Sequence, residues 1–352
     1  MYPTVENMDL VLVEATPEQA SITNRNTYVE WGYPQLTIDQ YLKREFILSN
    51  SVYNSESFKV WILVSTKDAN DTSKINESAI LSACETFKRK ALITLSSGQV
   101  QEATGYSIAS VYTPPQYRHQ GYGSTMMKLL SDKLRFYFKA EFSFLYSDIG
   151  TEFYGRFGWK AYPLKEVRFK VDNNFTTLSE NPAEIVTIDQ SNLESVIQQD
   201  CEYIKKEFSK LNKKSLVVLP INPTYNWFFE RSKYLSKSNE YPNILGVKIL
   251  KKQDIKGFVI WCPDFQYNKL EILRFRSDSQ QTTQLLIEKA KQEASRFKFK
   301  QVNLWNPDLR LFDLSREVEV EVVEMTKKLP SLAWYMDDGD VDWVLNEKYG
   351  WC

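Results

Sequence analysis

Two glycines stand at the start of an expected helix, in the segment YRHQGYGSTMM (117–127). The chain has only 12 Gly in 352 residues, and Gly121 and Gly123 follow Arg118 in an R-x-x-G-x-G pattern. The first N–H groups of a helix have no intrahelical partner and carry partial positive charge, so they attract an anion. Because glycine lacks a Cβ, a bulky diphosphate can approach this backbone closely. The segment therefore predicts an anion-binding cradle.

Other known glycine-rich sites do not fit this segment. A dinucleotide-binding fingerprint needs a third glycine at the position of Met126, within a parallel strand–helix–strand unit. A P-loop needs Gly-Lys followed by Ser or Thr, and that sequence is absent. An isolated G-x-G pattern would also fit a strand-to-helix turn that binds nothing, which stays as the alternative.

The cradle is predicted to lie between a strand and a helix. The run GYSIASVYT (105–113) has the composition of a strand and leads into Pro114 and Pro115. From Tyr122 onward, apolar residues recur at helical spacing, namely Met126, Met127, Leu130, Leu134, Tyr137 and Phe138. The glycines therefore open a helix directly after a strand.

The other elements of the first 165 residues are predicted to be mixed α/β. Thr16 and Pro17 mark a helix start, with Thr16 as the cap and Pro17 at the first helical position. Helices are expected at 17–31 and 37–49, and a polar loop at 67–78. A short strand is expected first, at 10–14. Four later β-rich runs separated by turn residues predict consecutive antiparallel strands, at 59–66, 79–87, 90–97 and 105–113.

Composition limits the class of protein. With 43% hydrophobic residues, a chain of this length can fill two cores, so disorder of the whole chain is not expected. Lys+Arg 44 against Asp+Glu 45 gives a net charge near zero, and no nucleic-acid partner is expected. The single histidine, His119, lies in the glycine loop with no evident Ser or Cys nucleophile nearby. Catalysis by a Ser-His-Asp or Cys-His arrangement is therefore not expected.

Cysteine usage and the lack of long apolar runs predict a location. The four cysteines lie far apart, with no C-x-x-C pair and no histidine cluster, so neither a metal site nor a disulfide framework is expected: Cys84, Cys201, Cys262 and Cys352. The first residues are acidic and fit no signal or transit peptide. No apolar run approaches the roughly 20 residues that span a bilayer. We expect a cytoplasmic protein with no membrane partner.

Two ordered segments resemble one family. SVYTPPQYRHQGYGSTMMKLL (110–130) resembles the coenzyme A signature of the GCN5-related N-acetyltransferases, in which a strand, a glycine loop and a helix hold the pyrophosphate. SFLYSDIGTEFYGRFGW (143–159) resembles the next strand and helix of that family, which end in an F-Y-x-x-x-G-[FW] pattern. The resemblance implies the mixed, mainly antiparallel sheet of that family, flanked by helices. It also implies acetyl-CoA as co-substrate.

The resemblance also implies roles for particular residues. Backbone groups at Val111 and Thr113 would bond the pantetheine arm and the thioester carbonyl. Tyr154 would protonate the departing thiolate, and Ser147 stands where the family often has an asparagine that contacts pantetheine. Serine reaches less far than asparagine, so this sequence departs from the family there. The pyrophosphate would be bound by the amides of Arg118, His119, Gln120, Gly121, Tyr122, Gly123 and Ser124.

The reaction that the family performs needs a proton donor and a base. A phenol can donate to a thiolate, although a tyrosine beside Phe153 can also be a core aromatic residue. The acceptor amine must lose its proton, and the strand ASVYT offers no acidic residue. Glu85, on a neighbouring strand, is one candidate for the base, with a solvent-facing strand residue as its alternative reading. The others lie in an acidic run that would more often be a solvated loop: Asp337, Asp338, Asp340 and Asp342.

The second half repeats the order of elements. A polar linker (172–184) is followed by the strand EIVTI, helices at 193–211 and 224–238, three strands, a capped helix and a last strand. The loop before that capped helix, RFRSDSQQTT, holds no glycine. This order predicts a degenerate second acetyltransferase-like α/β domain that binds no coenzyme and shapes the substrate side. The expected domains are residues 1–172 and 173–352.

The whole layout, with SACETFKRKALI and the ending LPSLAWYMDDGDVDWVLNEKYGWC, resembles the fungal lysine N6-acetyltransferases of the LYC1 type. That resemblance implies free L-lysine as the acceptor, in lysine degradation. Trp334 and Trp343 could add cation–π contacts to the substrate, or pack between the domains. Other small amines, polyamines, protein lysines, or acyl-CoA binding without catalysis stay open as alternatives, and the oligomeric state is undetermined.

Overall fold

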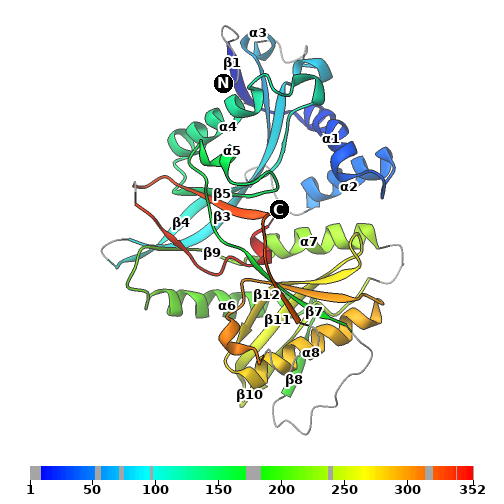
Figure 1. Cartoon of the computed structure of the whole chain (residues 1–352), viewed down its shortest axis with the longest axis vertical. Coiled ribbons are helices and arrows are strands. Elements are labelled where there is room, and N and C mark those ends of the chain that lie inside the picture. The colour runs from blue at the N-terminus through cyan, green and yellow to red at the C-terminus, as the bar shows by residue number, and fades with distance from the viewer. Residues whose placement is uncertain are drawn as a thin grey trace.

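The computed structural model describes residues 9–51, 57–70, 75–95, 98–171, 184–236, 241–313, 320–337 and 339–351. These residues form two largely antiparallel sheets, each flanked by helices, one in the upper and one in the lower part of Figure 1. The expected mixed α/β fold is confirmed. In the described part of the chain, no helix is long and apolar enough to cross a lipid bilayer.

The first sheet begins with five strands in chain order. They are β1 (Leu10–Glu14), β2 (Phe58–Ser65), β3 (Ser82–Thr94), β4 (Val100–Tyr112) and β5 (Phe142–Ser147), and only β4 and β5 are parallel. Helix α4 (Tyr122–Asp132), continued by a π-helical turn (Lys133–Tyr137), buries its apolar side against this sheet. The buried residues on that side include Met126, Met127, Leu130 and Leu134, as their helical spacing predicted.

Helix α1 (Pro17–Trp31) and helix α2 (Ile38–Ser51) follow β1, and the short helix α3 (Thr66–Ala69) follows β2. Thr16 caps α1 as predicted, because its hydroxyl accepts the Gln19 N–H at 3.3 Å while the Gln19 side chain accepts the Thr16 N–H at 2.9 Å. This reciprocal pair satisfies two N–H groups that the helix cannot bond internally.

One strand prediction was wrong. The runs 79–87 and 90–97 were expected to be separate strands, but residues Ser82–Thr94 form the single 13-residue strand β3. Lys88 and Lys90 are exposed while Arg89 between them is buried, which is the alternation of a continuous strand. Three consecutive basic residues therefore resembled a turn although they follow the period of a strand.

Strands are exchanged between the two halves of the chain. β15 (Leu329–Trp334) pairs with β5 and β6 (Lys160–Ala161), and β9 (Ser215–Val218) pairs with the end of β3 and with β16 (Asp342–Trp343). In the opposite direction, β7 (Lys165–Lys170) joins the second sheet. Sheet pairing thus does not follow the expected boundary after residue 172, and the division into domains 1–172 and 173–352 stays a prediction.

The second sheet has helices on both faces. Its strand order is β14-β7-β13-β12-β11-β10-β8. The remaining strands are β8 (Glu184–Ile188), β10 (Gly246–Lys251), β11 (Asp254–Asp264), β12 (Lys269–Ser277), β13 (Gln301–Trp305) and β14 (Val320–Glu324). One core contains side chains of helix α8 (Gln280–Arg296), and the other contains those of α6 (Leu193–Phe208) and α7 (Asn222–Leu235). Helix α7 lies between the two sheets beside α2 (Figure 1), and the Tyr234 hydroxyl donates to the Gln40 carbonyl at 2.7 Å.

Candidate functional site

A cavity of about 1230 Å³ lies where the first sheet meets α7 and residues 346–351, called the C-terminal segment below. Its wall contains most of the residues that the sequence predicted for the site: Glu85, Val111, Thr113, Arg118, His119, Gly121, Tyr122, Gly123, Ser124 and Tyr154. Gln120 and Ser147 are not part of that wall. The Gln120 side chain donates to the Gln116 carbonyl at 2.9 Å, and the buried Ser147 hydroxyl donates to the Gly150 carbonyl at 2.5 Å. Their roles stay predictions.

The predicted cradle is a run of free backbone N–H groups. Gly121 precedes α4 with φ +85°, a conformation that favours glycine, and no side chain caps the helix there. Within the described residues, the N–H groups from His119 to Ser124 have no hydrogen-bond partner, and the first helical bond is that from Thr125 to the Gly121 carbonyl at 2.9 Å. A Cβ on Gly123 would lie 3.2 Å from the Thr113 hydroxyl. The free N–H groups and this narrow approach fit the diphosphate of a coenzyme A molecule.

Arg118 supports the cradle loop with its side chain. Its Nε donates to the Thr113 carbonyl at 2.9 Å, and its Nη2 pairs with Glu30 of α1 at 3.0 Å. Its own N–H donates to the Pro115 carbonyl at 3.2 Å, so the free run begins at His119. The arginine of the R-x-x-G-x-G pattern thus ties the loop to α1 and to the end of β4.

The strand before the cradle leaves its neighbours near the cavity. Strands β4 and β5 are paired only from Gly105 to Ile108 of β4 and diverge beyond that point. The register between β3 and β4 also shifts, so that Ser110 and Val111 have no paired residue on β3. Ser110 adopts φ +53°, as a bulged residue can. This bulge brings Val111 to the cavity wall, where the sequence predicted a backbone contact with the acyl donor.

Tyr154 reaches the cavity from the short helix α5 (Glu152–Gly155). Its ring packs edge-on against Phe153, with 5.0 Å between the ring centroids. Burial raises the pKa of the Tyr154 phenol above its usual range, and the nearby Cys84 and Asp148 raise it further. No group in the described residues accepts or donates a hydrogen bond at its hydroxyl. The phenol therefore keeps its proton and can donate it into the cavity.

Glu85 lies on β3 opposite the bulge. Its Oε2 accepts a hydrogen bond from the Ser110 hydroxyl at 2.7 Å. Burial raises the pKa of Glu85 to about 7, with a further rise from Glu45, while the Ser110 hydrogen bond and Arg44 oppose the shift. A carboxylate with this pKa can take up a proton at neutral pH.

The acidic run near the C-terminus lies elsewhere. Asp337 pairs with Lys214, Asp340 with Lys160 at 2.8 Å and Asp342 with Lys213 at 2.5 Å, and none of these three lines the cavity. Asp338 lies outside the described residues. These ion pairs leave Glu85 as the predicted base that lies in the cavity.

The two tryptophans also lie away from the cavity wall. Trp343 packs against Phe144, Tyr146 and Tyr162, with ring centroids 5.0 to 6.3 Å apart. The Lys214 ammonium lies 5.7 Å from the Trp334 ring centroid. Trp334 packs against the same hydrophobic cluster as Trp343, so both rings serve packing, the alternative that the sequence left open. Within the described chain, no cluster of three or more His, Cys, Asp or Glu side chains could hold a metal ion.

Part of the cavity wall comes from the second half, and its individual residues were not named from the sequence. Helix α7 contributes Trp227 and Arg231, the end of β11 contributes Asp264, and the C-terminal segment contributes Lys348 and Trp351. The aromatic ending of the sequence was the only signal, and it indicated order at the terminus without a position. These residues extend the cavity beyond Glu85.

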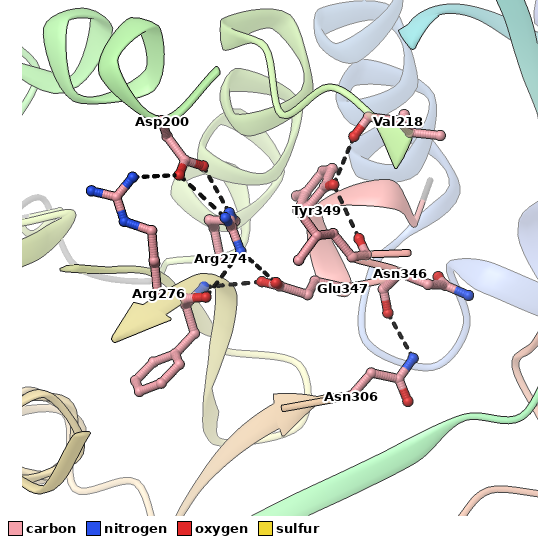
Figure 2. A network of polar contacts seen from close by, with 10 residues as sticks. Asp200, Val218, Arg274, Arg276, Asn306, Asn346, Glu347 and Tyr349 are labelled. Atoms are coloured by element: carbon pink, nitrogen blue, oxygen red, sulfur yellow. Dashed lines mark hydrogen bonds and ion pairs between the residues drawn. The ribbon is translucent and has the colours of Figure 1, made fainter. Parts of the chain in front are cut away.

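A polar network holds the C-terminal segment in place (Figure 2). Arg274 of β12 bonds Asp200 of α6 at 2.8 and 3.2 Å and pairs with Glu347, whose other oxygen accepts the Phe275 N–H at 3.0 Å. The Tyr349 hydroxyl donates to the Val218 carbonyl of β9 at 2.7 Å. The network thus joins the segment to both sheets and keeps Lys348 and Trp351 at the cavity.

In the second sheet, this network occupies the place that corresponds to the opening between β4 and β5 in the first sheet. Strands β12 and β13 are parallel and paired only from Leu270 to Ile272, and Glu347 fills the space where they diverge. Helix α8, which follows β12, is capped by its own Ser279 hydroxyl, which accepts the Thr282 N–H at 3.2 Å. Gly121 offers α4 no such cap. This contrast supports the prediction that the second half binds no coenzyme.

Comparison with known proteins decides the family. A family model described as the LYC1 GNAT-like C-terminal domain matches residues 167–352, which is just over half of the chain. The chain belongs to this LYC1-type family of GCN5-related N-acetyltransferases. It is an N-acetyltransferase with the fold that the two sequence motifs predicted.

Individual relatives agree with this family. A lysine acetyltransferase of Yarrowia lipolytica is 24% identical over 303 residues, which cover 74% of each chain. Among solved structures, a probable N-acyltransferase of Enterococcus faecalis V583 matches with a TM-score of 0.59 and 12% identity, over 93% of this chain and 72% of the other. A GCN5-related N-acetyltransferase of Kribbella flavida matches with a TM-score of 0.58 and 14% identity, over 94% and 72%. At these identities the structures support the fold.

Changing Gly123 to Glu tests the cradle of this acetyltransferase. A carboxylate in the first turn of α4 suits the helix but repels a diphosphate, so we expect the Kd for CoA to rise by about 100-fold. Gly123→Gln, which has nearly the same size and no charge, is the matched control and should weaken binding less. Isothermal titration measures both, and the melting temperature checks the fold. An unchanged affinity in Gly123→Glu would mean that the diphosphate binds elsewhere.

Proposed function

We propose that this protein acetylates the N6-amine of free L-lysine, by direct attack of the amine on acetyl-CoA. The observation that carries the proposal is one cavity that contains the free N–H groups of His119 and of residues 121–124, the protonated Tyr154 phenol and a Glu85 carboxylate with a pKa of about 7. The name of the Yarrowia lipolytica relative, a lysine acetyltransferase, supports the acceptor. The length of chain shared with that relative includes most of both proteins.

The residues of the cavity divide the work of the reaction. Acetyl-CoA supplies an activated acetyl group as a thioester. The N–H groups of the cradle bind its diphosphate, and the backbone at Val111 fixes the pantetheine arm. Glu85 accepts a proton from the acceptor ammonium, while the Ser110 hydroxyl orients the receiving carboxylate. Tyr154 donates its phenolic hydrogen to the departing sulfur.

The base must deprotonate an amine that is almost fully protonated at neutral pH. With a pKa near 10.4, fewer than about one lysine ε-amine in 10³ is neutral at pH 7. A carboxylate inside the cavity that takes the proton makes the much larger protonated population usable. Glu85 has the pKa for this transfer, because it ionises in the range where the protein must work.

Removal of the Tyr154 hydroxyl should slow the reaction. We expect Tyr154→Phe to lower kcat by about 10²-fold while the KM for acetyl-CoA changes little, because the ring packing is kept and the donor is lost. Thiol release under saturating acetyl-CoA measures this change. Phe153→Leu, which alters the packing but keeps the phenol, is the control. A Tyr154→Phe variant as fast as the parent would assign the residue to packing alone.

The acceptor is tested by an open screen. Free amino acids, polyamines and lysine peptides are incubated with acetyl-CoA, and the acetylated products are identified by mass spectrometry. We expect N6-acetyl-L-lysine as the main product. A peptide or polyamine product would assign the enzyme to another acceptor class, and CoA binding without thiol release from any amine would favour acyl-CoA binding without catalysis.

We further propose a cytoplasmic role in lysine degradation. The described cysteines Cys84, Cys201 and Cys262 are free thiols, which suits a reducing compartment. Acetylation of a free amino acid on its side chain removes the positive charge of that chain, as a first degradation step can do. Fractionation of cells that express the tagged protein tests the location.

A further inference from the structure

The cavity wall formed by the second half contains an arginine without a carboxylate partner. Arg231 lies on α7, one turn after Trp227, and its Nη2 donates to the Gln266 side-chain oxygen at 2.7 Å. That bond uses one of the five N–H donors of a guanidinium. Within the described residues, no Asp or Glu oxygen lies within 4.0 Å of the Arg231 guanidinium, so Arg231 forms no ion pair there. The remaining donors are available to a ligand.

Two other arginines of the same wall form ion pairs within the protein. Arg44 of α2 pairs with Glu45 at 2.5 Å, and Arg118 pairs with Glu30 at 3.0 Å. Burial lowers the pKa of Arg231, and the nearby Arg44 lowers it further, while Asp264 and Glu45 only partly compensate. A charged group that is desolvated and unpaired is stabilised when an anion binds to it.

Asp264 lies beside Arg231 and has the complementary charge. Its Oδ1 accepts the N–H groups of Gln266 at 3.1 Å and Tyr267 at 3.3 Å, and the residue lines the cavity without an ion-pair partner in the described chain. Gln266 therefore bonds both residues, with its side chain to Arg231 and its backbone to Asp264. The turn that contains Gln266 thus holds Arg231 and Asp264 together at the wall, and neither side chain has an ion-pair partner in the described chain.

We propose that Arg231 binds the α-carboxylate of the acceptor and that Asp264 binds its α-ammonium group. A guanidinium matches a carboxylate with two parallel hydrogen bonds, which is the geometry that discriminates an amino acid from a diamine. This inference rests on the proposed function and defines its acceptor class. A free amino acid presents both charged groups, whereas a peptide-bound lysine presents neither.

Lys348 is the competing carboxylate site on the same wall. Its ammonium lies 4.2 Å from the ring centroids of both Trp305 and Trp351, and burial lowers the pKa of Lys348 to about 8. Its lowered pKa weakens the charge of Lys348, and an ammonium lacks the planar fork that matches a carboxylate with two parallel hydrogen bonds, so Lys348 is a poorer carboxylate site than Arg231. The Lys348→Met variant therefore belongs in the test.

Three acceptor amines test the carboxylate contact and the ammonium contact separately. L-lysine carries both, 6-aminohexanoate keeps only the carboxylate, and cadaverine keeps only the second amine. Arg231→Met should lower kcat/KM for L-lysine relative to cadaverine by about 30-fold or more. Asp264→Asn should lower kcat/KM for L-lysine relative to 6-aminohexanoate by about 10-fold. Arg231→Lys should lie between Arg231→Met and the parent, since it keeps the charge without the planar fork.

Arg310→Met is the matched control, because Arg310 is exposed, pairs with Asp308 and lies outside the cavity. Equal losses for L-lysine and cadaverine in Arg231→Met and Arg231→Lys would overturn the inference, and so would a carboxylate preference that disappears in Lys348→Met alone. If the parent releases CoA with none of these amines, the proposed function fails separately. The head-group site is then decided by titrating the same three compounds into CoA-saturated protein, where Arg231→Met must weaken only the two carboxylates.

Discussion

Glu85→Gln should lower kcat/KM for the acceptor amine by about 10²- to 10³-fold at pH 7. Glutamine keeps the size of the side chain and can still contact the Ser110 hydroxyl, but it cannot receive the ammonium proton. The remaining rate depends on the small neutral fraction of the amine, which rises with pH. The loss should therefore shrink towards pH 10, where the amine loses its proton without help. Thiol release measured from pH 5.5 to 10 checks both statements.

The pH profile of the parent enzyme gives an independent measurement of the same group. Since burial and Glu45 raise the pKa of Glu85 to about 7, kcat/KM should rise with pH through a limb near 7, and Glu85→Gln should lack that limb. Glu45→Gln is the matched control. It removes a negative neighbour and frees Arg44, so the limb should move to lower pH while the activity above pH 8 is kept. A limb that stays in Glu85→Gln would assign the base to another residue.

As pH rises, the stability of the parent protein should fall while its activity rises. The folded pKa of Glu85, about 7, lies above its ordinary value of 4.5, so the folded protein binds the proton more tightly than the unfolded chain. The stability from this proton is present below pH 4.5 and is lost as pH rises through 7. The free energy of unfolding of Glu85→Gln should therefore increase relative to that of the parent from pH 4.5 to 7. Above pH 7 the difference should be about 3 kcal/mol. Urea unfolding at pH 5 and pH 8 separates this effect from a damaged fold.

Local rules were sufficient for the part of the site that we expect to hold the coenzyme. The cap at Thr16, the helix start after Gly121 and the helical side formed by Met126 and Leu130 depend on residues within a few positions of each other. The cradle follows from the same short segment, because its chemistry is that of the backbone. Glu85 could be named because it lies on the strand next to the one that leads into the cradle.

The acceptor side could not be predicted in the same way. Arg231 and Asp264 are 33 positions apart in the chain, and Lys348 follows much later. Arg231 and Asp264 meet because α7 packs against β11, and this wall is tied to the first sheet by strand exchange, since β7 leaves for the second sheet and β15 returns to β5. No periodicity of the sequence reports such an exchange, because each strand has the same alternation in either sheet. The error over β3 has a related cause, since three basic residues in a row hide the period of the strand.

The buried network around Arg274 should be needed to hold the C-terminal segment, and a Glu347→Ala variant tests this. Desolvation opposes the charge of Arg274, but Asp200 and Glu347 outweigh it and raise the pKa of that guanidinium well above its usual range. Removing one of two buried carboxylates leaves Arg274 partly uncompensated and the Phe275 N–H without its acceptor. We expect a loss of about 3–5 kcal/mol in the free energy of unfolding, measured by urea denaturation.

The same variant should also weaken the acceptor site, because Glu347 fixes the segment that carries Lys348 and Trp351 at the cavity. We expect a higher KM for the acceptor while the affinity for CoA, which we expect the cradle on α4 to bind, changes little. Glu324→Ala is the matched control, since Glu324 forms an exposed pair with Lys165 and should cost less than about 1 kcal/mol. If Glu347→Ala unfolds at the same urea concentration as Glu324→Ala, the buried network does not hold the segment. The second half would then have to shape the cavity through α7 and β11 alone.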